Sequence, residues 1–397
     1  MRIESIKIQN FKAFKDVEMA DIPRFCVLIG ANGTGKTTFF DVFGFLKDCL
    51  VYDVRKALQV RGGFNEVLSK GCDHRELIYI ELKFRQFIKD KERTVTYILE
   101  IGAENNNPYV NREVLRYKRG RYGSPFHFLD FSKGTGYAIP KEEDFDKLDE
   151  ELDKEYQALD NQYILAVKGL GQFQRFKAAN AFRQFIENWH VSDFHINLAR
   201  GVKDAAGMSE HLSVTGDNLQ QVAYNLYETR RDILDKIISK MKQRIPGVTD
   251  VIPQSTEDGR LLLKFQDGSF SDPFIDRFVS DGTMKMFAYL VLLYDPQPHP
   301  LLCVEEPENQ LYPSLLEELA EEFREYANRG GQVFVSTHSP DFINATELHE
   351  VYWLSKKLGY TTIKRAKNDP LISNYMKEGD KMGYLWKQKF FDGVDPE

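Results

Sequence analysis

The feature that most constrains this chain is an eight-residue segment, GANGTGKT, at residues 30–37. It follows the short apolar run Phe25–Ile29 and precedes a stretch of helical periodicity from Gly35 to Leu50. The segment fits the pattern GxxxxGK[ST], whose glycines let backbone N–H groups point inward and whose following helix adds partial positive charge. A strand, this loop and a helix together predict a phosphate-binding turn.

Two side chains of the loop have distinct expected roles. Lys36 would place a point charge beside the β- and γ-phosphates of a nucleotide, and the Thr37 hydroxyl would bind Mg²⁺. The alternative, a glycine-rich turn without a ligand, is disfavoured because strand and helix flank the loop correctly. The expected nucleotide contacts in this loop are Gly30, Ala31, Asn32, Gly33, Thr34, Gly35, Lys36, Thr37 and Thr38.

A second apolar run ends in two acids. Leu301–Val304 leads into Glu305 and Glu306, so a buried strand would place both carboxylates at its C-terminal edge. We expect Glu305 to orient the Mg²⁺ shell and Glu306 to position or deprotonate the attacking water. A later strand, FVST, runs into His338, which would sense the γ-phosphate. A structural acid pair and a structural histidine are the alternatives.

The segment Ser280–Thr283 leads directly into the helical run MKMFAYLVLLY. A serine N-cap, a glycine and a new helix N-terminus make a second anion site, although alone they would be an ordinary helix start. One active site does not need two such helix ends. We therefore expect Ser280 and Gly282 to complete a nucleotide site in a partner subunit.

The sequence divides into four expected parts. Residues 1–76 form the N-terminal half of a head domain, and residues 77–140 form an inserted antiparallel β lobe. Residues 141–247 form a helical subdomain that begins with an acidic helix or short arm, Lys141–Asp160. Residues 248–397 return to alternating strands and helices. This alternation at both ends predicts an α/β fold with a mixed, mostly parallel sheet built from both halves.

Composition excludes several classes of protein. With 53 basic and 60 acidic residues, the net charge of −7 excludes a uniformly basic nucleic-acid coat. No apolar run approaches the roughly 20 residues that span a bilayer, and the start lacks the apolar core of a signal peptide. The four cysteines form no CxxC pair. The segment HVSDFH contains His190, Asp193 and His195, but it offers no third clear ligand at helical spacing. It therefore does not predict a metal site. We expect a soluble, cytoplasmic protein.

Four motifs, GANGTGKT, SDGT, LLCVEEPENQLYP and FVSTHS, occur in the order typical of ABC-class ATPase heads of the RecF/SMC group. The chain resembles that group over almost its whole length, and IKIQNFKAFKDVE before the phosphate loop is also similar. Within the group, GLGQFQRF and GYLWKQKFFDG look most like stand-alone ATPases related to the OLD family. The resemblance implies an ABC-type head in which Ser280–Thr283 is the signature motif, Glu305 and Glu306 end Walker B, Pro307–Pro313 is the D-loop, and His338 is the switch histidine.

The resemblance further implies an ATP- and Mg²⁺-dependent ATPase that forms a head-to-tail homodimer or a higher oligomer. ATP bound at Lys36 of one chain would be sandwiched by Ser280 and Gly282 of the other, and hydrolysis through Glu306 would reopen the dimer. Glu305 departs from the family, whose Walker B motif normally ends in Asp-Glu. The Q-loop glutamine has two candidates, Gln172 and Gln86.

OLD nucleases carry a TOPRIM domain with an Asp-x-Asp motif, and no such motif follows His338. The resemblance therefore predicts a separately encoded effector, a TOPRIM-like nuclease, that this ATPase controls in DNA-linked antiphage defence. Two basic clusters suit contact with DNA phosphates, but they suit a solvated surface better. The clusters are Arg112, Arg116, Lys118, Arg119 and Arg121, and Lys356, Lys357, Lys364, Arg365 and Lys367.

Three other functions stay open. The main alternative is an autonomous DNA repair ATPase similar to RecF, which would act without an effector. A membrane transporter's ATPase subunit is disfavoured by the inserted lobe, the helical block and SDGT in place of LSGGQ. In the third, the nucleotide is a structural ligand that fixes an assembly. This function stays open because a glutamate at 305, in place of the usual aspartate, is compatible with slow hydrolysis.

Overall fold

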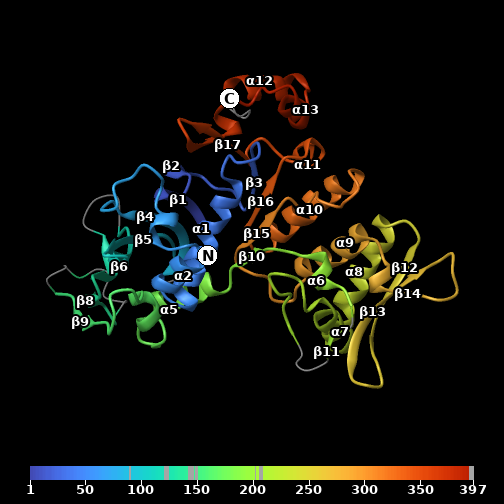
Figure 1. Cartoon of the computed structure of the whole chain (residues 1–397), viewed down its shortest axis with the longest axis horizontal. Coiled ribbons are helices and arrows are strands. Elements are labelled where there is room, and N and C mark those ends of the chain that lie inside the picture. The colour runs from blue at the N-terminus through green and yellow to red at the C-terminus, as the bar shows by residue number, and fades with distance from the viewer. Residues whose placement is uncertain are drawn as a thin grey trace. The chain divides into compact units, whose positions relative to one another are not determined.

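The computed structural model describes the chain except for residues 89–90, 120–124, 142–146, 148–150, 202, 205–208 and 393–397. The chain forms two compact units (Figure 1). Unit 1 comprises Met1–Trp189, Glu347–Asp380 and Leu385–Glu397, and unit 2 comprises His190–Thr346 and Lys381–Tyr384. The phosphate loop belongs to unit 1, whereas the acidic strand end, Ser280 and His338 belong to unit 2.

The larger sheet of unit 1 has eight strands among the described residues, all antiparallel, in the order β2-β1-β4-β5-β6-β7-β8-β9. The lobe expected at residues 77–140 thus continues a sheet that the first two strands of the chain begin. The strands are β1 (Arg2–Phe11), β2 (Phe14–Met19), β4 (Ile78–Ile88), β5 (Lys91–Glu104), β6 (Asn107–Tyr117), β7 (Phe126–Ser132), β8 (Thr135–Ala138) and β9 (Glu155–Ala158).

The last of these strands corrects an expectation. The acidic segment Lys141–Asp160 was expected to be helical, but Glu155–Ala158 is strand β9, paired antiparallel with β8. Tyr156 lies opposite Tyr137, with ring centroids 5.8 Å apart. Pairing with an available sheet edge and an aromatic cross-strand contact outweigh the helical tendency of this acidic stretch. Residues 142–146 and 148–150 lie outside the described residues.

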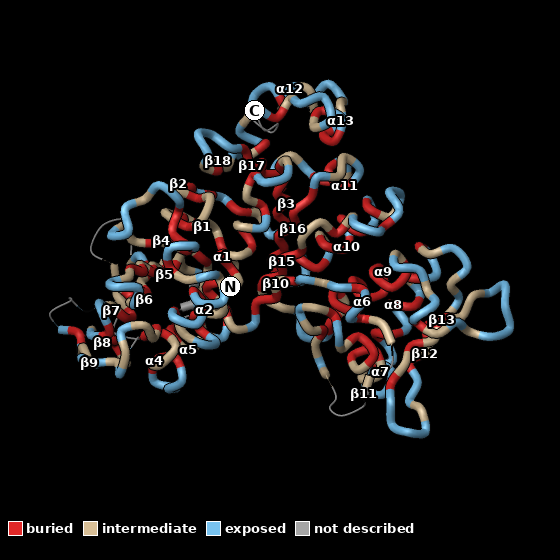
Figure 2. Tube along the Cα trace, in the orientation of Figure 1, coloured by how far each residue is buried: buried red, intermediate tan, exposed pale blue. Residues whose placement is uncertain are grey.

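A second set of strands in unit 1 carries the phosphate loop. Strand β3 (Phe25–Ile29) is buried at every position and pairs in parallel with β17 (Val351–Lys357), which pairs antiparallel with β18 (Tyr360–Arg365). Segments from the two ends of the sequence therefore build one sheet, as the alternating pattern predicts. Figure 2 shows β3 as a continuous buried stretch, the burial typical of a parallel strand.

Helix α1 (Lys36–Val51) follows the loop and is fixed from both faces. Phe39 and Phe43 are fully buried, and the Phe43 ring lies 5.4 Å from that of Trp189. On the polar face, the Arg61 guanidinium donates to Asp41 and to Asp48, each at 2.7 Å. The other helices of unit 1 are α2 (Val54–Val60), α3 (Phe64–Val67), α4 (Ala166–Leu170), α5 (Lys177–Glu187) and α12 (Pro370–Glu378), and α13 (Met382–Lys387) includes residues of both units.

In the described part of unit 2, three strands run parallel in the order β10 (His190–Ser192), β15 (Leu302–Glu305) and β16 (Val333–Thr337). A second sheet is formed by β11 (Lys203–Asp204), β12 (Val248–Ser255), β13 (Arg260–Asp267) and β14 (Phe274–Ile275). The helices are α6 (Ile196–Ala199), α7 (Leu219–Thr229), α8 (Arg231–Arg244), α9 (Asp281–Leu293), α10 (Ser314–Asn328) and α11 (Pro340–Asn344). Over the part of the chain that the structure describes, no helix combines the length and the apolar character that crossing a membrane requires.

The buried carboxyl group of Glu113, in β6, joins two parts of unit 1. It accepts hydrogen bonds from the backbone N–H groups of Ala166 and Val167 at the start of α4, and from the Tyr97 hydroxyl at 3.0 Å. Burial raises the pKa of Glu113 from 4.5 to about 7, against the opposing effect of these hydrogen bonds. An acid with a higher pKa in the folded chain holds its proton more tightly there. Its contribution to stability is therefore greatest at low pH and is lost as pH rises from 4.5 to about 7.

We expect the variant Glu113→Gln, which cannot ionise, to lose this pH dependence. Between pH 6 and pH 8 the free energy of unfolding of the wild type should fall by about 1 kcal/mol more than that of the variant. Urea unfolding of both proteins at the two pH values measures the difference. Parallel pH profiles would show that Glu113 is ionised throughout.

Candidate functional site

The phosphate loop depends on two glycines with left-handed backbone angles. Gly33 has φ of 79° and Gly35, which directly precedes α1, has φ of 106°. A Cβ atom at Gly35 would also lie 2.7 Å from the Thr361 hydroxyl, which donates to the carbonyl of Thr34 at 2.8 Å. Other residues would be strained at both positions. The sequence therefore sets the shape of this loop through residues that carry no side chain.

Lys36 is the first residue of α1, and it is only 7% exposed. Its ammonium group donates to the carbonyl of Gly30 at 2.8 Å and to that of Ala31 at 3.3 Å. The positive charge is thus held inside the curve of the loop and at the positive end of the helix dipole. Asn32, Gly33 and Thr37 are exposed, so the loop is open to solvent. The nine expected nucleotide contacts are consecutive residues of this loop and of the first turn of α1, and the arrangement fits a phosphate group.

In unit 2 the acids and the histidine follow neighbouring strands. Glu305 ends β15, and the N–H of Glu306 donates to the Ser336 carbonyl of β16 at 2.9 Å. His338 follows the end of β16 and places Nδ1 3.3 Å from Glu306 Oε1. Glu306 has φ of 42°, a left-handed conformation that costs a non-glycine residue about 1–2 kcal/mol. Such strain is common where a side chain must be aimed for function.

Glu308, which the resemblance includes in the D-loop range Pro307–Pro313 without a role of its own, organises this loop. Its side chain is 8% exposed, and Oε1 accepts from the Thr337 hydroxyl at 2.6 Å and from the N–H groups of His338 at 2.9 Å and Ser339 at 3.2 Å. The same oxygen lies 3.5 Å from His338 Nδ1. A third acid in the run EEPE is the only signal in the sequence. Glu308 positions the backbone that carries His338.

Ser280 caps α9 as predicted, because its hydroxyl accepts from the N–H of Thr283 at 3.2 Å. Gly282 lies against the turn that follows the acids: a Cβ there would be 2.7 Å from the carbonyl of Gln310. One turn later, Lys285 donates to the carbonyl of Asn309 at 2.7 Å. Burial lowers the pKa of Lys285 to about 8, against the opposing charges of Glu308 and Glu306. The turn at residues 306–310 therefore contacts both the start of α9 and the His338 loop.

The two expected Mg²⁺ ligands belong to different units, Thr37 to unit 1 and Glu305 to unit 2. The Q-loop candidates Gln86 and Gln172 both belong to unit 1, where Gln86 lies in β4 and Gln172 is exposed after α4. Of the HVSDFH segment, His190 lies in β10, and the exposed His195 places Nε2 3.3 Å from Asp193 Oδ2.

A family model described as "AAA domain, putative AbiEii toxin, Type IV TA system" matches residues 25–344. The chain belongs to this AAA-domain family. Membership assigns it to the ATPase class and confirms the resemblance to RecF/SMC-type ATPases, while the closer likeness to OLD-related ATPases stays a prediction. No curated protein sequence matches the chain.

Two solved structures show the fold of this AAA-domain protein. An Smc head bound to the C-terminal winged-helix domain of ScpA is 13% identical, with a TM-score of 0.56 over 92% of this chain and 98% of the other. The Smc head from Pyrococcus furiosus, with an extended coiled coil and the C-terminal domain of ScpA, is 13% identical, with a TM-score of 0.50 over 95% of this chain and 99% of the other. The expected α/β fold of an ABC-type ATPase head is confirmed.

The role of Glu308 can be measured through stability. In Glu308→Ala, two backbone N–H groups and the Thr337 hydroxyl lose their acceptor, so we expect the free energy of unfolding to fall by about 2 kcal/mol. Urea unfolding compares the variant with Glu317→Ala, an exposed position on α10 that should change stability by less than about 0.5 kcal/mol. Equal losses in the two variants would show that Glu308 does not hold the His338 loop.

Proposed function

We propose that this chain binds and hydrolyses ATP with Mg²⁺, dimerises around ATP, and controls a separately encoded effector, a TOPRIM-like nuclease, in DNA-linked antiphage defence. The observation that carries the proposal is the buried Lys36 ammonium inside a glycine-rich loop at the start of α1. A glycine-rich loop at a helix start, with a lysine ammonium held inside it, fits a phosphate group. Family membership favours a nucleotide as the ligand that carries this phosphate.

The unit 2 residues support hydrolysis. Glu306 is 28% exposed on its side chain and lies beside His338, which is half exposed, so both reach solvent where a substrate water could approach. In this proposal Glu306 positions the water and accepts its proton, and His338 contacts the γ-phosphate. Bound Mg²⁺ would neutralise phosphate charge, with Thr37 and Glu305 as its proposed protein ligands. Catalysis would rest on positioning and charge stabilisation.

The start of α9 supports a nucleotide-dependent dimer. Ser280 and Asp281 are exposed, so this helix N-terminus is accessible to a group from outside the chain. The negative charge of Asp281 would disfavour a phosphate, but Arg200 forms an ion pair with it. The pairing leaves the helix dipole and the Ser280 hydroxyl to bind an anion. We infer that Ser280 and Gly282 of one subunit contact ATP held by Lys36 of the other.

Family membership supports the link to defence, because the matching family is described by a toxin and a Type IV TA system. Direct DNA contact has weaker support. Arg112 already pairs with Asp130 at 3.0 Å, and Lys364 pairs with Asp392 at 3.2 Å. Arg121 lies outside the described residues. DNA binding and a cytoplasmic location therefore stay predictions.

The variant Glu306→Gln tests the proposed chemistry. We expect it to bind ATP as the wild type does, to hydrolyse it at least about 100-fold more slowly because the proton acceptor is lost, and to accumulate as a dimer. ATPase assays and light scattering with and without ATP measure these effects. Glu317→Gln is the matched control and should behave like the wild type, whereas Lys36→Ala should neither bind ATP nor dimerise. If Glu306→Gln hydrolyses ATP at the wild-type rate, another residue activates the water.

The effector is tested by expressing the chain with the product of its neighbouring gene. We expect the two proteins to copurify, and ATP to change the effector's nuclease activity in proportion to the dimer formed. The wild-type chain alone should show the same ATPase rate with and without gapped DNA. Strong stimulation by gapped DNA with no associated effector would instead favour the autonomous, RecF-like repair ATPase.

A further inference from the structure

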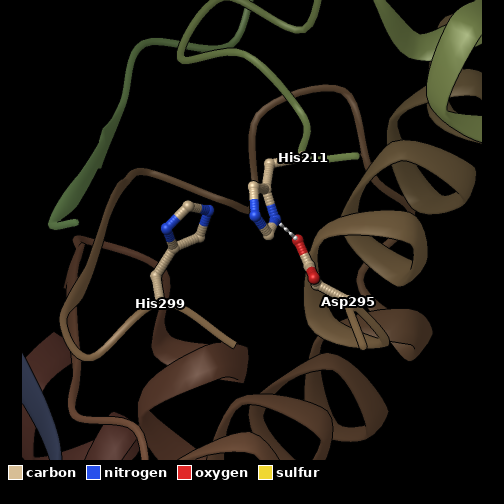
Figure 3. Close-up of side chains that lie close together, drawn as sticks. All are labelled: His211, Asp295 and His299. Atoms are coloured by element: carbon tan, nitrogen blue, oxygen red, sulfur yellow. Dashed lines mark hydrogen bonds and ion pairs between the residues drawn. The ribbon is translucent and has the colours of Figure 1, made fainter. Parts of the chain in front are cut away.

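Three side chains of unit 2 that have no role in the proposed ATPase chemistry meet at one point (Figure 3). His211 precedes α7, Asp295 follows the end of α9, and His299 lies just before β15. The Nδ1 atom of His211 is 2.7 Å from Asp295 Oδ2. One potential ligand atom from each of the three residues lies within 4.8 Å of the other two.

We propose that His211, Asp295 and His299 bind a divalent transition-metal ion of the zinc class. Two neutral imidazoles and one carboxylate carry a net charge of −1, and they are typical ligands of Zn²⁺ and similar ions but not of Mg²⁺. In a tetrahedral zinc site with bonds of about 2.0–2.1 Å, neighbouring ligand atoms lie about 3.3 Å apart. An ion would replace the His211–Asp295 hydrogen bond, whose two atoms at 2.7 Å would separate by about 0.6 Å, and the more distant ligand atoms, up to 4.8 Å apart, would approach by at most about 1.5 Å. The His211 side chain is 39% exposed, so solvent reaches its ring.

The surroundings hold the ligands in place. Asp295 is 4% exposed on its side chain, and its second oxygen, Oδ1, accepts from the N–H of Gln297 at 2.8 Å. The carbonyl of His211 accepts from the Asn218 side chain at 2.9 Å, and the carbonyl of His299 accepts from the Tyr326 hydroxyl at 3.0 Å. The hydrogen bond to Oδ1 orients the Asp295 carboxylate, and the other two fix the backbone that carries the histidines.

The cluster also has an entry path and a further nitrogen nearby. A cleft of about 340 Å³ is lined by His211 and Asp295, together with Asn225 and Gln297 but not by His299, so an ion would approach the cluster from the side of His211 and Asp295. The His190 ring centroid lies 4.8 Å from that of His299, and the His211 centroid lies 5.4 Å from it. Three of the chain's eight histidines therefore gather here. Among the residues that the structure describes, His195 and Asp193, 3.3 Å apart, belong to no group of three potential ligands.

A bound ion would tie together three separate segments of unit 2. One of them follows α9, whose opposite end carries Ser280. The ion would cross-link the loop at His211 and the segment at His299 to the end of this helix. It would therefore raise the thermal stability of unit 2, because binding to the folded state alone shifts the unfolding equilibrium.

The test uses the full chain, first freed of metal with EDTA, and titrates it with Zn²⁺ in competition with a chromophoric chelator. We expect one tight site per chain and a rise in melting temperature on adding Zn²⁺. His211→Gln and Asp295→Asn should each weaken Zn²⁺ binding at least about tenfold. The control His195→Gln should bind Zn²⁺ like the wild type. The Co²⁺-substituted protein should show the strong d–d bands of a tetrahedral site without a thiolate charge-transfer band, which separates this site from cysteine binding.

Three results would overturn the proposal: no tight Zn²⁺ site in the wild type, equal affinity in Asp295→Asn, or a thiolate band in the Co²⁺ spectrum. A fourth overturning result is a lower melting temperature for Asp295→Asn together with no effect of Zn²⁺ on that of the wild type; the cluster is then an ordinary His–Asp hydrogen bond. Asp295→Asn keeps the shape of the side chain, and far-UV circular dichroism establishes that each variant is folded. Binding is then compared only between folded proteins.

Discussion

The central constraint in this protein is a lysine ammonium group held in a turn of the backbone. Lys36 is buried, and carbonyl oxygens of its own loop accept its hydrogen bonds. The loop can take this shape because Gly33 and Gly35 adopt left-handed angles. The buried strand β3 and the aromatic face of α1 then fix the two ends of the loop. Desolvation raises the energy of the charge, and an anion bound at the same place lowers it.

In unit 2, polar groups are held in place by a buried carboxylate. Glu305 and Glu306 at the end of β15 are followed by a third acid, Glu308. The nearly buried Glu308 gathers the backbone N–H groups of the His338 loop, which leaves Glu306 and His338 beside each other at the surface. The turn that carries these acids also contacts the start of α9 near Gly282. A displacement of the start of α9 is therefore expected to move Glu306 as well, through the turn at residues 306–310.

The sequence predicted the features that local patterns encode. The strand before the phosphate loop, the helix after it and the Ser280 cap follow from periodicity and from residues that suit one backbone geometry. The helix expected at Glu155–Ala158 was wrong because strand pairing with β8 is decided by contacts that the local pattern does not contain. The support from Glu308 and the meeting of His211 with Asp295 likewise join residues far apart in the sequence. The pattern of residues within one segment does not indicate which distant segment it will contact.

The most direct test of the central claim is a crystal structure of the Glu306→Gln chain with Mg²⁺ and a non-hydrolysable ATP analogue. We expect the Lys36 loop of one molecule to surround the triphosphate, and the Ser280 hydroxyl of a second molecule to lie within hydrogen-bonding distance, about 3 Å, of the γ-phosphate. An analogue bound to Lys36 whose γ-phosphate lies far from Ser280 of every neighbouring molecule would contradict it.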